Sequence, residues 1–316
     1  MKFIYSAIAL LFAQCAIAAP SLRKRADAAE ACSVGFCTLN GGTTGGAGGS
    51  TTTVTTLAEL TAAVSGSDAK IVIIDGEITG NEVIKVGSNT SLLGTSSASL
   101  VGVGLRVINE KNVIIRNIKI SKVVAPGDNV AVQASNQVWV DHMDLSSDKD
   151  HGKDFYDGLL DITHGCTGIT LSNNHLHDHF KGSLVGHSDN NGDEDTAIRV
   201  SYFGNWFDSL NSRGPSFRFG QGHIFNNYYT SVSDGINIRD EGQVLVENNV
   251  WVDAKKPLYS TDGGLAVANG NDFGGAENTA GAGTISASDL GYEYTLAETS
   301  TVAAGVQASA GQTLDF

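Results

Sequence analysis

The chain contains little proline and relatively few basic residues for its 316-residue length. It has only 4 prolines, and no long linker divides it, so a single large domain is expected. Its 20 basic residues face 34 acidic ones, which gives a formal net charge of −14. This balance argues against nucleic acid or an acidic membrane as partner. A polyanionic ligand would need a local basic patch or bridging cations.

Long apolar runs are also missing, because no stretch beyond the N-terminus approaches the roughly 18 apolar residues of a membrane helix. The N-terminus itself predicts a signal peptide over residues 1–19, with Lys2, a short apolar core at 8–12 and small residues at 16–19. That core is too short for a membrane anchor. The pair Lys24-Arg25 resembles a dibasic processing site. We therefore expect a short propeptide at 20–25, a mature domain at 26–316 and a secreted, extracellular protein.

Cysteines are few, and their positions suggest different fates. Cys15 lies in the predicted signal peptide, whereas Cys32 and Cys37 are close enough to form a disulfide in an oxidising compartment. Cys166 is left over in an apolar setting, where a buried, inert thiol is favoured over a nucleophile. Asn89 begins the sequon Asn-Thr-Ser and is a predicted glycosylation site.

From about residue 70 onward, short β-branched runs such as 71–74, 138–140 and 244–246 alternate with turn-rich segments. Many runs end in asparagine, a residue that tolerates left-handed backbone at a bend. The positions taken to mark successive turns are 117, 142, 174, 205, 227 and 249. A repeat near 22 residues with longer excursions predicts stacked coils with variable loops, and stacked asparagines can bond along a ladder. A β-sandwich or β-propeller fits less well, since paired hairpin turns are missing and the period is too short for blades.

The N-terminal end of such a coil needs a cover for its apolar interior. Thr56 and Glu59 form a capping-box pattern, and the apolar residues at 57, 60 and 64 share one helical face. We expect a short capping helix there. Beyond about Ala276 the repeat fades, which predicts a C-terminal tail packed on the outside.

The segment from 128 to 218 holds the candidate chemistry. It is dense in aspartate, at positions 128, 141, 144, 148, 150, 154, 157 and 161. Hard oxygen ligands at this density suggest calcium, although solvated loops would also explain many of them, and the EF-hand spacing is absent. Basic residues follow at 181, 199, 213 and 218, and a Gly-Pro turn could bring Arg213 and Arg218 into one groove. Arginine suits carboxylate recognition.

Three histidines, His175, His177 and His179, alternate in sequence and would share one face of a strand. Zinc accepts imidazole ligands, so a zinc site is one interpretation. Stacking of polar and aromatic residues on the outside of a coil is the alternative that we favour.

At these residues the chain resembles polysaccharide lyase family 1, the pectate and pectin lyases. The resemblance covers essentially the whole mature chain. It is carried by the run Val-Trp-Val-Asp-His at 138–142, Asp-Gly-Leu-Leu-Asp at 157–161, and the Arg-x-Pro-x-x-Arg-x-Gly-like run from 213, which has Gly214 after the first arginine. The resemblance implies an all-β fold, the right-handed parallel β-helix.

The resemblance also implies roles for individual residues. Asp128, Asp157 and Asp161 match the family's primary Ca²⁺ ligands, while a further acidic position of some members is Pro126 here. The remaining matches are Lys181 and Arg218 for substrate binding and Arg213 for the general base. The implied activity is β-elimination of polygalacturonate (pectate) by a pectate lyase. A free guanidinium has a pKa above 12, so an arginine base leads us to expect an alkaline optimum.

Three other functions stay open at this stage. A pectin lyase would act on methyl-esterified polymer without calcium, but the persistence of three carboxylates favours pectate lyase. A polygalacturonase-type hydrolase would need paired carboxylates as acid and base or nucleophile. A non-catalytic β-helical carbohydrate-binding protein would not need Lys181, Arg213 and Arg218 together. We expect a monomer.

Overall fold

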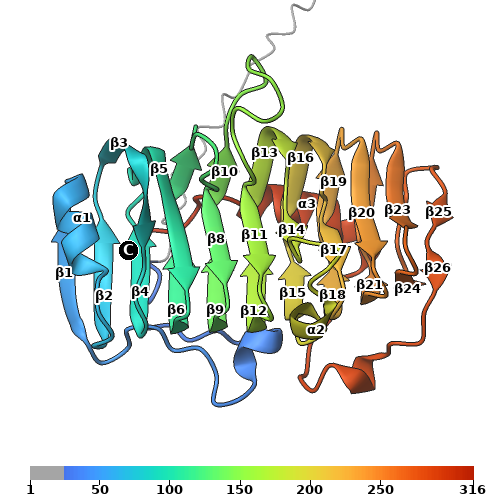
Figure 1. Ribbon diagram of the computed structural model, residues 1–316, viewed down its shortest axis with the longest axis horizontal. Coiled ribbons are helices and arrows are strands. Elements are labelled where there is room, and N and C mark those ends of the chain that lie inside the picture. The colour runs from blue at the N-terminus through green and yellow to red at the C-terminus, as the bar shows by residue number, and fades with distance from the viewer. Residues whose placement is uncertain (1–24) are drawn as a thin grey trace, which may run out of the picture.

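The computed structural model describes residues 25–316, which wind into a parallel β-helix of about ten turns (Figure 1). Neighbouring strands pair in parallel because each turn of the coil lies on the turn before it. The predicted fold class is therefore confirmed. The predicted signal peptide at 1–19 and all but the last residue of the propeptide at 20–25 lie outside the described residues, so both stay predictions.

One wall of the coil is an 11-stranded sheet that contributes one short strand from each turn. Its strands, in spatial order, are β1 (Ser50–Val54), β2 (Lys70–Ile74), β4 (Thr90–Gly94), β6 (Lys111–Arg116), β9 (Asn136–Asp141), β12 (Thr167–Ser172), β15 (Arg199–Phe203), β18 (Gln221–Phe225), β21 (Gln243–Glu247), β24 (Leu265–Asn269) and β26 (Gly281–Ala282).

A second sheet of 15 strands forms the other two walls, because the long strand β5 (Ser99–Ile108) pairs with β7 through its first half and with β8 through its second. β3 (Glu77–Lys85) also pairs with β5. The wall that starts at β7 comprises β7 (Lys119–Ser121), β10 (Asp144–Ser146), β13 (His175–Lys181), β16 (Trp206–Ser212), β19 (Tyr228–Thr230) and β22 (Val250–Val252). The wall that starts at β8 comprises β8 (Val130–Gln133), β11 (Leu160–Thr163), β14 (Leu184–Val185), β17 (Ser216–Arg218), β20 (Asp234–Arg239), β23 (Lys256–Ser260) and β25 (Asn278–Thr279).

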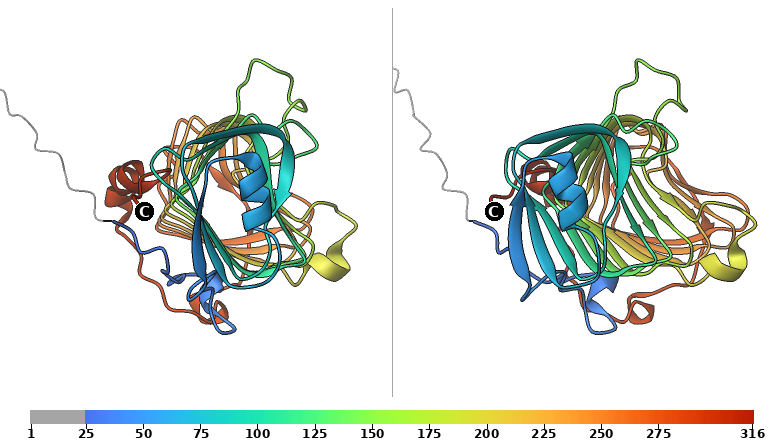
Figure 2. Two further views of the ribbon diagram at one scale, coloured as in Figure 1. Left: turned by 90° about the vertical axis from the view of Figure 1, so that its left-hand side faces the viewer. Right: turned by 60° about the vertical axis from the view of Figure 1, so that its left-hand side comes forward.

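The predicted capping helix is present as α1 (Leu57–Ala63), which lies across the first turns at one end of the coil (Figure 2). Both hydrogen bonds of the capping box form, from Glu59 N to the Thr56 side chain and from Thr56 N to the Glu59 side chain. Leu60 and Val64 are fully buried against the core. The helix thus covers apolar surface that the first turn would otherwise expose.

A ladder of buried asparagines joins successive turns at the bend between β15 and β16 and its equivalents. Each side-chain Nδ2 donates to the Oδ1 of the next asparagine at 2.9–3.0 Å, and the separations along the chain are 31 residues and then 22 three times. The predicted asparagine ladder is confirmed, and it runs one turn further than expected. Its members are Asn174, Asn205, Asn227, Asn249 and Asn271.

The prediction placed Asn117 and His142 in this same row, and that register is wrong by one residue. Lys119, Asp144 and His175 lie opposite one another in β7, β10 and β13, so Asn117 and His142 align with Asn173 and not with Asn174. All three share a left-handed φ of 50–61°. The bend therefore has two asparagine-rich positions, of which the first adopts the left-handed backbone and the second points inward into the ladder.

Apolar and aromatic side chains fill the interior along its whole length. Phe207, Tyr229 and Trp251 stack with ring centroids 4.8 and 4.5 Å apart and nearly parallel planes. They stand at successive turns of β16, β19 and β22, so the coil places equivalent residues directly over one another. This stacking is the core's counterpart of the asparagine ladder.

The outside tail starts slightly later than Ala276, because β25 and β26 add a last short turn to the coil up to Ala282. The chain then runs back along the outside with the 3₁₀ turn η2 (Ala287–Asp289) and α3 (Thr299–Ser309) (Figure 1). The apolar side of α3 packs on Tyr228 and Val250. The other short helices are η1 (Phe36–Thr38) and α2 (Gly192–Asp195).

Three cysteines and the sequon asparagine have defined surroundings. Cys32 and Cys37 are joined by a disulfide next to Trp139. Cys166 is a fully buried free thiol, and burial raises its pKa to about 12. Asn89 is half-buried, and its Nδ2 donates to the Ser67 carbonyl at 2.9 Å. Its glycosylation stays a prediction.

Candidate active site

Three aspartates from two parts of the chain converge in a cleft of about 290 Å³ on the wall formed by β8, β11 and β14. Asp128 precedes β8, Asp157 ends the long segment between β10 and β11, and Asp161 lies in β11. This segment rises above the coil at the top of Figure 1. The residues that line the cleft are Arg106, Pro126, Asp128, Gln133, Asp157, Asp161, Thr163, Leu184, His187 and Arg213.

The strand register explains why distant residues meet here. Arg106, Ala131 and Asp161 lie opposite one another on β5, β8 and β11, one turn apart. Because Ala131 has the smallest side chain of the three, space remains between the guanidinium and the carboxylate. The coil thus stacks charged residues in a row on one face.

The position of the Asp161 carboxylate depends on Gly158. A Cβ at Gly158 would lie 2.5 Å from Asp161 Oδ1, so any larger residue here would push the carboxylate out of its present position. The backbone N–H groups hold two of the carboxylates, since Gly158 N donates to Asp128 Oδ1 at 2.8 Å and Leu184 N donates to Asp161 Oδ1 at 2.9 Å. The second oxygen of each carboxylate stays available for a ligand.

The surroundings in the cleft disfavour the ionised forms of Asp128 and Asp161. Burial raises the pKa of Asp128 to about 6, and the neighbouring Asp157 charge adds to this rise. Burial likewise raises the pKa of Asp161 well above its ordinary value, with Asp128 as the next cause. Like charges held together out of water are stabilised by a bound cation, and carboxylate oxygens are the ligands that Ca²⁺ prefers. Asp128, Asp157 and Asp161 are therefore the residues that could hold a metal in this cleft.

Two cations flank these carboxylates. Arg213 Nη1 lies 3.8 Å from Asp161 Oδ2, and its side chain is 26% exposed, so solvent and ligands can reach it. Lys181 is buried and its Nζ contacts Asp157 Oδ1 at 3.0 Å and Asp154 Oδ1 at 3.3 Å. Gly182 permits this arrangement, because a Cβ there would lie 2.5 Å from the Arg213 carbonyl.

Arg218 is not among the residues that line this cleft. Its Nε donates to Asp189 Oδ1 at 2.6 Å, its Nη1 donates to the Gly186 carbonyl at 2.9 Å, and Asp240 Oδ2 lies 3.4 Å away. The two arginines thus have different surroundings, with Arg213 at the three carboxylates and Arg218 paired to acidic groups of its own.

Sequence reasoning missed Arg106, Gln133, Thr163 and His187 as cleft residues. Arg106 is the most notable, because its Nε is buried without a hydrogen-bond partner and the same side chain lines a second cleft with Asn81 and Pro126. A signal for it was present, since Arg106 is an isolated charge within an otherwise apolar strand.

The three alternating histidines do not share one face, which corrects that expectation. His175 and His177 stack on the outside with ring centroids 4.2 Å apart. Asp178 adopts a left-handed φ of 50°, which changes the direction of the strand, and His179 is buried against Ser147 and Asp157 instead. Burial, together with the nearby Lys181 and Arg213 charges, lowers the pKa of His179 to about 4. His179 is therefore neutral beside the cleft at ordinary pH.

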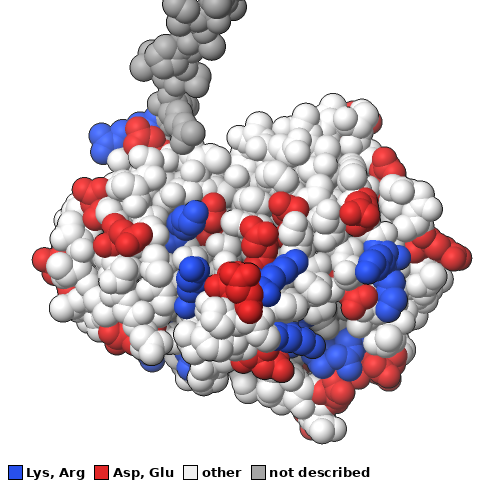
Figure 3. Space-filling model, turned by 90° about the horizontal axis from the view of Figure 1, so that it is seen from above, with Lys and Arg blue, Asp and Glu red and all other residues white. Residues whose placement is uncertain are grey.

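Charged side chains of both signs are interspersed across the face seen from above, with no large patch of one sign (Figure 3). This face therefore offers a charged ligand individual side chains of either sign and not a broad field of one sign.

Comparison with known proteins gives consistent matches. Residues 8–313 match the family described as "Pectate lyase". Pectate lyase A of Aspergillus niger is 54% identical over 323 residues, which cover 100% of this chain and 99% of the relative. Pectate lyase A of Emericella nidulans is also 54% identical, over 327 residues, with 100% of this chain and 99% of the relative covered.

Solved structures agree. A pectate lyase from Bacillus sp. N165, crystallised in complex with trigalacturonate, superposes with a TM-score of 0.80 at 27% identity and covers 89% of this chain and 98% of its own. Pectate lyase II from Xanthomonas campestris gives a TM-score of 0.78 at 26% identity with the same coverage. Within residues 25–316, no helix has the length and apolar character needed to span a membrane.

Proposed function

Because the chain belongs to the pectate lyase family and is a polysaccharide lyase, we propose that it cleaves (1→4)-α-D-galacturonan by calcium-dependent β-elimination. The products would be 4,5-unsaturated oligogalacturonides. The observation that carries this proposal is the convergence of Asp128, Asp157 and Asp161 in one cleft beside Arg213. The trigalacturonate bound by the related Bacillus enzyme supports the choice of substrate.

The donor set of the cleft fits calcium. It offers three carboxylates, and burial together with a neighbouring carboxylate raises the pKa of two of them. When bound, calcium would supply positive charge that stabilises the developing negative charge on a uronate carboxylate. It would also bridge an acidic protein of net charge −14 and an acidic polymer.

In the proposed reaction, Arg213 removes the proton from C5 of the uronate. The electron pair of the broken C5–H bond forms the C4=C5 double bond, the C4–O bond breaks, and the leaving oxygen takes a proton from water. Only an unprotonated guanidine nitrogen can accept the C5 proton, so the rate should rise with pH. A rate that falls steadily above pH 7 would contradict the assignment of Arg213 as base.

Lys181 and Arg218 would orient the polymer through its carboxylates. Lys181 pairs with Asp154 and Asp157, and Arg218 pairs with Asp189 and Asp240. Fixed cations of this kind reduce the orientational freedom of a bound anion. Asp189 is exposed, so a substrate carboxylate can compete with it for the Arg218 fork.

The proposal also covers where the protein acts, its oligomeric state and its processing. We expect an extracellular monomer, processed after Arg25 and glycosylated at Asn89. Mass spectrometry of the secreted protein would give its N-terminus and any glycan, and light scattering would give its mass in solution.

Three proteins test the mechanism, namely the wild type, Arg213→Ala and Asp161→Asn. Product formation is followed by the ultraviolet absorbance of the unsaturated uronide, calcium binding by calorimetry and polymer binding by co-sedimentation. Arg213→Ala should keep calcium and polymer binding but lose turnover, whereas Asp161→Asn should lose calcium binding as well. Turnover by Arg213→Ala close to the wild-type rate would refute its role as base.

A further inference from the structure

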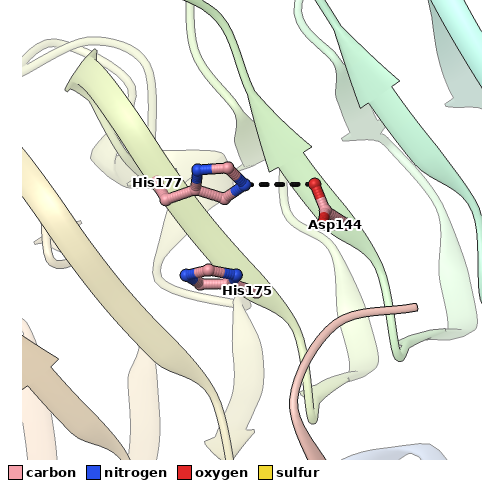
Figure 4. A group of neighbouring side chains, drawn as sticks. All are labelled: Asp144, His175 and His177. Atoms are coloured by element: carbon pink, nitrogen blue, oxygen red, sulfur yellow. Dashed lines mark hydrogen bonds and ion pairs between the residues drawn. The ribbon is translucent and has the colours of Figure 1, made fainter. Parts of the chain in front are cut away.

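A second group of possible metal ligands lies on the outer surface of the wall that contains β10 and β13, away from the aspartate cleft. It consists of Asp144 on β10 and His175 and His177 on β13, with Asp144 directly opposite His175 in the strand register (Figure 4). One ligand atom from each residue lies within 4.8 Å of the other two. No other group of three histidine, cysteine, aspartate or glutamate side chains meets this condition within residues 25–316.

Hydrogen bonds to carboxylates hold His177, whereas ring stacking holds His175. His177 Nδ1 lies 2.9 Å from Asp178 Oδ2, and its Nε2 lies 3.1 Å from Asp144 Oδ1. A carboxylate on one ring nitrogen fixes the ring and leaves the other nitrogen to face a ligand, as in many metal-binding histidines. His175 stacks between His177 and Trp206, and its Nε2 is buried without a hydrogen-bond partner.

We propose that Asp144, His175 and His177 form a binding site for a divalent transition-metal ion, Zn²⁺ in the first place, separate from the oxygen-rich cleft. Two imidazoles two residues apart on one strand plus a carboxylate from the neighbouring strand give the mixed nitrogen and oxygen ligands that zinc accepts. Calcium, by contrast, takes oxygen ligands. The site does not depend on the proposed function of the cleft.

Two of the three ligand atoms already have the spacing that a zinc ion requires. With zinc bonds of about 2.0–2.2 Å, tetrahedral ligands are roughly 3.4 Å apart. The His177 Nε2 to Asp144 Oδ1 distance of 3.1 Å already has this size, so the ion would replace the proton that the two atoms share. The His175 ring must turn toward them, out of its stack between His177 and Trp206.

The charges around the site are mainly acidic. Asp178 and Asp208 lie beside the two histidines, with Asp208 Oδ2 3.9 Å from His175 Nε2. Lys119 is the positively charged exception, and it lies opposite Asp144 on β7. The surplus of negative charge favours a cation.

Metal binding here would join two turns of the coil next to the C-terminal tail. Gly311 donates its N–H to the Asn173 carbonyl at 2.8 Å, and a Cβ at Gly311 would lie 3.3 Å from His175 Cβ. An ion bound to Asp144 and His175 therefore secures β10 and β13 at the point where the tail lies on them. Binding to the folded state alone raises the melting temperature.

The test uses untagged, chelator-treated secreted protein in saturating calcium, titrated with Zn²⁺ by calorimetry. The wild type should bind one equivalent and melt at a higher temperature with zinc. His177→Ala and Asp144→Asn should each weaken zinc binding by about tenfold or more. The matched control is His164→Ala, because His164 also stacks on a histidine, His187, and contacts a carboxylate, Glu194 Oε2 at 3.1 Å.

Two further measurements keep the test decisive if a variant folds poorly. Cu²⁺ bound to the wild type should show electron-paramagnetic coupling to two imidazole nitrogens, and His175→Gln should show one. Asp161→Asn should lose calcium but keep zinc, which separates this site from the cleft. No stoichiometric zinc binding by the wild type, or equal loss in His164→Ala and His177→Ala, would overturn the proposal.

Discussion

Asp128→Asn should stabilise the calcium-free protein and at the same time remove its activity. Burial, followed by the Asp157 charge, raises the pKa of Asp128 from 3.8 to about 6. Because the pKa is higher in the folded state than in the unfolded state, ionisation of Asp128 opposes folding. This cost is absent below about pH 4, grows as the pH rises and is complete above about pH 6.

The structure gives the size of the effect. A rise of about two pKa units corresponds to about 3 kcal/mol at pH 8 and about half of that at pH 5. Asparagine keeps an oxygen that can accept the hydrogen bond from Gly158 N, 2.8 Å in the wild type, but it carries no charge. The free energy of unfolding should therefore rise by up to about 3 kcal/mol at pH 8, or about 6 °C in melting temperature.

The assay is thermal or urea unfolding of the chelator-treated wild type and Asp128→Asn at pH 5 and pH 8, with Asp68→Asn as an exposed control. Added calcium should reverse the order at pH 8, because it binds the wild type more tightly than the variant. A variant less stable than the wild type at both pH values in chelator would refute the account of the cleft as a site of uncompensated charge.

Three other predictions concern the ladder, the cleft and the free thiol. Asn205→Ala removes two donated and two accepted hydrogen bonds in the buried ladder and should lower the free energy of unfolding by about 3–4 kcal/mol in urea, with exposed Asn190→Ala near neutral. Arg106→Ala should raise KM for polygalacturonate about tenfold with a smaller change in kcat, because Arg106 is a positively charged residue that lines the cleft, whereas exposed Lys111→Ala should change neither; unchanged KM in Arg106→Ala would exclude carboxylate binding. Cys166 should stay unmodified by a thiol reagent at pH 8 until the protein is unfolded, since its pKa is about 12; rapid labelling of the native protein would contradict its burial.

The features that the sequence predicted well are those governed by local or strictly repeated chemistry. The capping helix follows from the Thr56 and Glu59 pair, whose hydrogen bonds depend only on residues three apart. The coil follows from the repeat near 22 residues, because equivalent positions must stack. The ladder register was wrong by one residue because asparagine occupies both positions of the bend, as at Asn173 and Asn174.

The features that could not be predicted depend on the backbone conformation of single residues and on which strands lie next to each other. The left-handed backbone at Asp178 separates His179 from His175 and His177, and alternation in sequence gives no sign of it. Arg106 belongs to the cleft only because β5 lies one turn from β8, and the length of the intervening loops hides this register. The family resemblance supplied the three aspartates and Arg213, whereas the residues between them on the wall came from the structure alone.

The most direct test of the central claim is the ultraviolet absorbance of a 4,5-unsaturated uronide during incubation with polygalacturonate, first with calcium, then with chelator, then with calcium restored. We predict a rise that stops on chelation and resumes with calcium, and that is slower on methyl-esterified pectin. A rise that ignores the chelator and is faster on esterified pectin would contradict the calcium site. Reducing ends that appear without any absorbance would mean hydrolysis, and the elimination mechanism would be wrong.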